Sequence, residues 1–119
     1  LHSGALLHGL AGMVLANTQY GITNRDVLEA IRVHTTGKVG MSKLDKVIFL
    51  ADYIEPNRNF PGVNDIRAAA EQSLDIGVLC GFDTTIRHLI DSGDTIYPLT
   101  IISRNDLIQH MKKGGAYNG

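Results

Sequence analysis

Side chains able to bind a metal ion or a phosphate group stand at four places in this sequence. His8, His34 and Asp52 can each ligate a metal, and the planar guanidinium of Arg58 suits phosphate oxygens. Asp52 is the most unusual, because it lies within the apolar helical run of residues 44–54. An ionised carboxylate there is costly unless a cation, a metal or several donors compensate it. The alternative is a structural Asp at the helix edge, hydrogen-bonded to neighbouring backbone.

Each of the other three candidates also has a structural alternative. His8 lies at helical spacing before apolar residues, so it can be a satisfied histidine in the core. His34 ends the apolar face of its helix, where it can cap the last carbonyl groups. Arg58 falls in residues 57–62, a loop rich in turn residues, and can simply be solvated. Both interpretations therefore stay open at all four positions.

Composition describes a single globular domain without a strong electrostatic character. The 119 residues are 44% hydrophobic and 19% charged, with a formal net charge of −1. This charge gives no reason to expect nonspecific binding to nucleic acid or to a membrane. The single cysteine, Cys80, cannot form an intrachain disulfide, and no stretch resembles a signal peptide or a spanning segment. A cytoplasmic location is therefore expected.

Apolar residues recur at helical spacing and never alternate as in a strand, which predicts an all-α fold. A capping box of Thr23 and Asp26 is expected to start the second helix, and Ser42 to cap a central helix that ends at Pro56. The central helix has no wholly polar face, so it should lie within the core. The remaining helices are expected over residues 3–20, from Asn64 or Asp65 through Leu74, from Ile76 to Ser92–Gly93, and from Pro98 through Met111.

Four strings in the sequence together indicate a known family. Residues 7–9, 30–37, 40–42 and 51–63 strongly resemble the bacterial YqeK family of HD-domain phosphohydrolases, and the similarity continues to about Asn105. The resemblance implies an HD-domain-like helical bundle that hydrolyses diadenosine tetraphosphate symmetrically into two ADP molecules. It also implies metal-assisted phosphoryl transfer.

The resemblance further implies roles for individual residues. Asp52 falls on the family's last iron-ligating aspartate, so iron is the expected cofactor, with a second ion possible in the complete domain. No catalytic nucleophile or base is assigned. The expected ADP contacts are His8, His34, Thr35 and Arg58, together with a segment lining the same nucleotide: Thr95, Ile96, Tyr97, Pro98, Leu99 and Thr100.

Two departures from the family pattern affect these expectations. The family's N-terminal histidine and its His-Asp pair, all metal ligands, should precede Leu1. Residues 1–119 are therefore expected to be the C-terminal portion of one HD domain, without its first helices and inactive alone. Leu99 stands where members usually carry an acidic residue after the proline, which removes an expected cap of the last helix.

Two other functions remain as alternatives. A catalytically incomplete regulatory module could retain His34, Thr35 and Arg58 and bind ADP without turnover. A purely helical interaction domain would use none of these residues. If covering helices are missing, an exposed apolar face also makes a homodimer possible.

Overall fold

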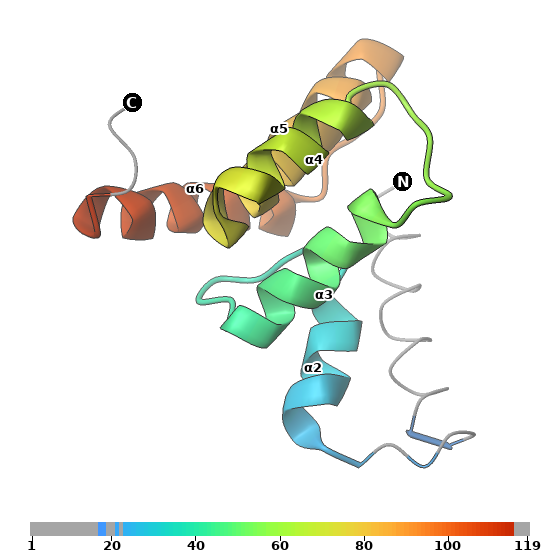
Figure 1. Cartoon of the computed structure of the whole chain (residues 1–119), viewed down its shortest axis with the longest axis vertical. Coiled ribbons are helices and arrows are strands. Elements are labelled where there is room, and N and C mark those ends of the chain that lie inside the picture. The colour runs from blue at the N-terminus through green and yellow to red at the C-terminus, as the bar shows by residue number, and fades with distance from the viewer. Residues whose placement is uncertain (1–16, 19–20, 22, 116–119) are drawn as a thin grey trace.

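The computed structural model describes residues 17–18, 21 and 23–115, and over residues 23–115 it is helical with no strand (Figure 1). The all-α prediction is therefore confirmed for this part of the chain. The expected first helix lies outside the described residues, apart from Asn17 and Thr18, which are helical. None of the described helices is long and apolar enough to cross a membrane. The helices are α2 (Arg25–Val33), α3 (Lys43–Ile54), α4 (Val63–Gln72), α5 (Leu74–Ser92) and α6 (Pro98–Lys113).

Capping residues set the beginnings of the first two of these helices. Asn24, not Thr23, caps α2: its side-chain oxygen accepts from the N–H groups of Asp26 and Val27, at 3.0 and 3.2 Å. The predicted capping box of Thr23 and Asp26 is therefore wrong, because Asn24 already satisfies those donors. Ser42 caps α3 as predicted, in a reciprocal capping box with Asp45.

The boundary between α4 and α5 differs from the prediction. Val63 begins α4, so the predicted start at Asn64 or Asp65 is slightly late. Ser73 separates the two helices, since its hydroxyl accepts from the N–H group of Ile76 at 3.0 Å. Leu74 therefore begins α5 and does not end α4. The predicted glycine stop is confirmed, because Gly93 closes α5 with φ of 71°.

The last helix starts at Pro98, as predicted. Tyr97 is its extended N-cap residue, and no side chain hydrogen-bonds to cap the start of α6. This uncapped start agrees with the expected effect of Leu99 in place of an acidic residue.

The hydrophobic core lies where α3, α4, α5 and α6 meet. Phe49 on α3 packs against Phe82 on α5, with ring centroids 4.6 Å apart. Figure 1 shows α4 and α5 side by side, and α3 packs against both of them and against α2. The other members of the buried cluster are Leu50, Ile66, Val78, Leu79, Leu107, Ile108 and Met111.

The central helix α3 is less deeply buried than its apolar sequence predicted. Val47 is 41% exposed and Ala51 is also exposed, so the prediction that α3 lies within the core holds for only one side of the helix. Its buried residues are Asp45, Phe49 and Leu50, because α3 turns only part of its circumference towards its neighbours. The buried carboxylate of this helix is Asp45, at 1% exposure, whereas Asp52 is half-buried.

Candidate nucleotide-binding site

His34 and Thr35 lie in the turn that follows α2, and both are half-buried. The His34 ring places Nδ1 at hydrogen-bonding distance from the Ile31 carbonyl. This contact is the capping role that stood as the structural alternative for His34. Gly37 ends the turn with φ of 74°, and a Cβ there would lie only 2.6 Å from the Phe82 ring. The turn is therefore held directly against the core.

The predicted nucleotide-lining segment of residues 95–100 meets this turn. The Thr100 hydroxyl donates to the Thr36 carbonyl at 3.4 Å, across 64 residues of sequence, and both side chains are buried. In the same segment Thr95 and Pro98 are exposed, whereas Ile96, Tyr97 and Leu99 are half-buried. The structure thus brings two of the predicted ADP-contacting segments together at the N-terminal end of α6. Such a helix end attracts anions.

Ion pairs fix the turn after α2 to the start of α3. Lys38 lies 2.9 Å from a carboxylate oxygen of Glu29 and 3.4 Å from one of the buried Asp45. Arg32 also pairs with Glu29, at 2.6 Å. Hydrogen bonds from Arg32 and then Lys38 lower the pKa of Glu29 to about 2. Glu29 therefore stays ionised and helps to hold both ends of the segment that carries His34.

Asp52, the predicted metal ligand, lies in the last turn of α3 and is half-buried. Across the described residues, no group of three or more His, Cys, Asp or Glu side chains is arranged to hold a metal ion. His8, which was a second possible ligand and an expected ADP contact, lies outside the described residues. The described residues therefore do not form a complete metal site. The role of Asp52 as a metal ligand stays a prediction.

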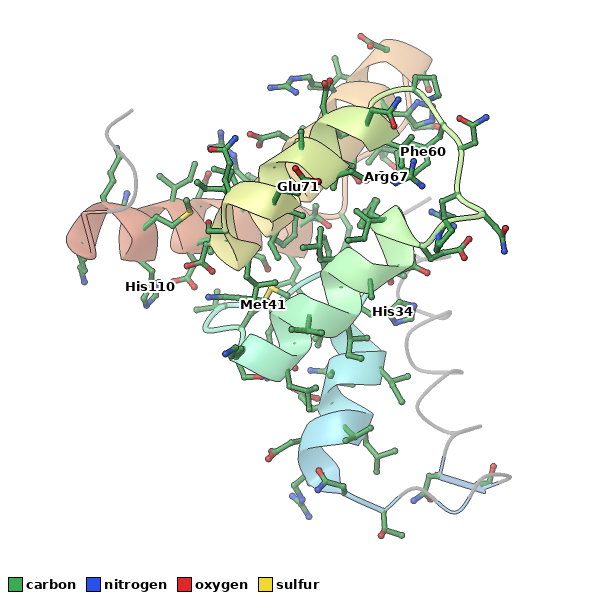
Figure 2. The ribbon with its side chains drawn as sticks, in the orientation of Figure 1. His34, Met41, Phe60, Arg67, Glu71 and His110 are labelled. Carbon is green, nitrogen blue, oxygen red and sulfur yellow. The ribbon has the colours of Figure 1, made fainter. Side chains whose placement is uncertain are left out.

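Arg58 is exposed in the loop between α3 and α4, and its guanidinium lies over the Phe60 ring, 5.6 Å from the centroid. Its backbone N–H donates to the Glu55 carbonyl at 3.0 Å. Arg67 on α4 donates from Nη2 to the carbonyls of Glu55 and Arg58, at 3.1 and 2.9 Å. Figure 2 shows Phe60 and Arg67 at the upper right of the view, with His34 below them. The loop backbone is thus fixed while the Arg58 guanidinium faces solvent.

A pocket of about 450 Å³ opens between this loop and the C-terminal half of α5. The Tyr53 hydroxyl and the Thr85 hydroxyl lie 2.7 Å apart in its wall. Burial raises the pKa of Tyr53, and the nearby Asp52 carboxylate adds to this, while the Thr85 hydrogen bond and Arg58 oppose it. Tyr53 is therefore a neutral hydrogen-bonding group. The full lining is Tyr53, Arg58, Phe60, Pro61, Gly62, Asp65, Thr84, Thr85, Arg87, His88, Leu89 and Asp91.

Most of these lining residues were not among the predicted site residues, because the sequence pattern indicated no functional candidate in the helices now assigned as α4 and α5. A signal is nevertheless present, because Thr84, Thr85, Arg87 and His88 form a polar stretch in a helix that is otherwise largely apolar. Only the folded chain shows that the α3–α4 loop lies opposite and closes a pocket over it.

Comparison with known proteins identifies homologues of this chain. No protein-family model matches the chain. It is 45% identical over 107 residues to a protein from Halalkalibacterium halodurans named "Bis(5'-nucleosyl)-tetraphosphatase, symmetrical", covering 90% of this chain and 57% of that protein. A Bacillus subtilis protein of the same name is 39% identical over 107 residues, covering 90% and 58%.

A solved structure gives the same result. The crystal structure of a predicted HD superfamily hydrolase involved in NAD metabolism, from Clostridium acetobutylicum, matches with a TM-score of 0.82 and 50% identity. The match covers 88% of this chain and 56% of that one. The resemblance to the HD-domain phosphohydrolases is therefore confirmed, and the chain spans just over half the length of the curated relatives it matches.

Proposed function

We propose, on the premise that this chain is homologous to HD-superfamily hydrolases, that it supplies nucleotide-binding residues for symmetrical cleavage of diadenosine tetraphosphate into two ADP. The homologues named for this reaction support the proposal. The observation that carries it is the Thr36–Thr100 hydrogen bond, which joins the His34–Thr35 turn to the segment of residues 95–100. Two segments that the resemblance assigns to one ADP are thus neighbours despite their separation in sequence.

The side chains of Arg58, His34 and Thr35 each suit contact with a nucleoside diphosphate. The Arg58 guanidinium can hold two phosphate oxygens in a bidentate fork, and it makes no ion pair within the described residues. His34 and Thr35 offer an imidazole and a hydroxyl beside the start of α6, where the helix dipole favours negative charge. The flexible phosphate chain would therefore be bound by backbone groups in fixed positions and by a few polar side chains.

For the metal, we propose that Asp52 contributes one ligand to a divalent ion, with iron as the candidate. The support is the match of the segment around Asp52 to the family motif and the position of Asp52 at the end of α3, six residues before Arg58. The other ligands do not come from a cluster within the described residues. We also propose a cytoplasmic location, which the single cysteine supports.

A nucleotide-binding module without turnover is the second candidate. The observation that favours it is the absence, across the described residues, of a three-ligand metal cluster. Product analysis separates the two in a chimera in which this chain replaces the aligned segment of the Halalkalibacterium halodurans relative. Diadenosine tetraphosphate should yield ADP as the only product. AMP together with ATP would contradict symmetrical cleavage. No turnover, beside an active unaltered relative, would favour the second candidate.

ADP binding to the chain itself tests the nucleotide role of Arg58. Arg58→Ala should weaken binding by about tenfold or more, because a hydrogen bond to a charged group contributes about 1.5–3 kcal/mol. Arg25→Ala is the matched control, since Arg25 is also an exposed arginine but lies at the start of α2. Equal ADP affinity in the parent and in Arg58→Ala, measured by isothermal titration calorimetry, would contradict the assignment.

A further inference from the structure

We propose that the pocket between the α3–α4 loop and α5 binds the second nucleoside end of the dinucleotide, while the first end lies at the junction of α2 and α6. This inference rests on the proposed function and adds a binding site to it. The pocket contains no residue from the His34–Thr35 turn or from the segment of residues 95–100. It is therefore separate from the first group of expected ADP contacts, and Arg58 is the residue that the two sets share.

The walls of the pocket suit a flat aromatic ring. Tyr53 and Phe60 pack edge to face with ring centroids 6.2 Å apart, and Pro61 and Leu89 add apolar surface. The volume of about 450 Å³ lies within the usual range of small-molecule sites, roughly 300–1,000 Å³. A purine base would bury its faces against such walls, since aromatic rings favour offset or edge-to-face packing.

The lining of the pocket carries charges of both signs, from two arginines and two aspartates. Arg58 and Arg87 line it, and neither forms an ion pair within the described residues, whereas Arg32 and Arg104 pair with carboxylates at 2.6 and 2.8 Å. Two guanidinium groups in one pocket, neither ion-paired with a carboxylate among the described residues, suit a phosphate chain.

The same lining holds the carboxylates of Asp65 and Asp91. These side chains would repel phosphate, but they can accept hydrogen bonds from ribose hydroxyl groups or from an amino group of the base. A ligand that meets all of these features has an aromatic base, a polyol and a phosphate chain, as a nucleotide has. A substrate with two identical ends needs a second place for one of them, and Arg58 belongs both to the lining of this pocket and to the ADP contacts that the resemblance implies.

Titration of the parent chain and of Arg87→Glu with two probes, ADP and diadenosine tetraphosphate, tests the inference. The parent should bind diadenosine tetraphosphate about tenfold or more tightly than ADP, because one further charge-assisted contact contributes about 1.5–3 kcal/mol. Arg87→Glu should reduce that preference to about twofold or less while ADP affinity stays near the parent value. Arg25→Glu, the control on an exposed arginine of α2, should keep the preference.

A second variant, Phe60→Leu, removes one of the two aromatic rings in the wall and retains most of its bulk, and it should also reduce the preference for diadenosine tetraphosphate. Circular dichroism establishes that each variant is folded. If the parent binds ADP but shows no preference for the dinucleotide, or if both pocket variants keep the preference, the second site is wrong and the proposed function stands. If the parent binds neither probe, the proposed function is contradicted as well.

Discussion

Arg67 holds the backbone of Arg58 in place by donating a hydrogen bond from Nη2 to its carbonyl at 2.9 Å. The same nitrogen also donates to the Glu55 carbonyl at 3.1 Å, immediately after α3 ends. The loop between α3 and α4 is therefore tied to α4 at two points. The arginine proposed to bind phosphate thus stands on a backbone that another arginine fixes.

Arg67→Ala should lower the free energy of unfolding by about 1.5–3 kcal/mol, because two carbonyl groups lose a charged donor. It should also weaken ADP binding, since Arg58 loses its support. Urea denaturation and calorimetry measure the two effects. Arg67→Lys should recover part of both losses, as an ammonium can still donate to a carbonyl. Parent stability and parent ADP affinity in Arg67→Ala would show that the tie has no role.

Gly37→Ala should destabilise the chain more than Gly40→Ala. Both glycines have positive φ, at 74° and 69°, and this backbone alone costs a non-glycine residue about 1–2 kcal/mol. A Cβ at Gly37 would also meet the Phe82 ring at 2.6 Å, whereas a Cβ at Gly40 meets nothing within 4 Å. Overpacking of this kind adds about 1–3 kcal/mol. Equal losses in thermal or urea unfolding would contradict the close packing of the turn.

Glu29 should contribute stability that disappears in acid. Its pKa is about 2 in the folded chain against an ordinary 4.5, so the folded state holds the ionised form more strongly than the unfolded state does. The contribution is present above about pH 5 and is lost as pH falls through 4.5 towards 2.

Urea unfolding of the parent and of Glu29→Gln measures this contribution at pH 6 and near pH 3. The difference between the two should be largest at pH 6 and should shrink near pH 3. Glu71→Gln, at an exposed glutamate of α4, controls for the loss of one negative charge. A constant difference between the parent and Glu29→Gln at both pH values would mean that the ion pairs of Arg32 and Lys38 do not lower the pKa of Glu29.

Local signals explain why much of the fold could be predicted from the sequence. Ser42, Gly93 and Pro98 act on backbone groups within a few residues, so their positions predicted the ends of three helices correctly. Asn24 and Thr23 are both good capping residues, and only the backbone geometry decides between them. Leu74 was placed in the wrong helix because an apolar residue fits the pattern of either neighbour.

Non-local packing explains what could not be predicted. The burial of Asp45 depends on Lys38, which approaches from the preceding loop, so periodicity gave no reason to prefer it to Asp52 as the buried carboxylate. The pocket likewise needs the α3–α4 loop and α5 to meet. The roles of His34, Thr35 and Arg58 came from the family resemblance, and they stay predictions until a ligand is observed.

Asp52→Ala should remove most of the bound iron from the chimera with the Halalkalibacterium halodurans relative while leaving its helical content unchanged. The reason is that one proposed ligand is lost from a half-buried position near the surface of α3. Inductively coupled plasma mass spectrometry gives the metal content and circular dichroism the helicity. Asp26→Ala, at an exposed aspartate of α2, is the control. Equal metal content in Asp52→Ala and the parent chimera would exclude the ligand role.

The most direct test of the proposed ADP site is a map of amide chemical shifts in the ¹⁵N-labelled chain during titration with ADP. The largest shifts should fall on His34, Thr35 and Thr100 and on the amide of Arg58, because these residues surround the proposed diphosphate. The first turn of α2 and the last turn of α6 should change little. Shifts that spare residues 34–35 and 95–100, at ADP concentrations that saturate binding, would contradict the site.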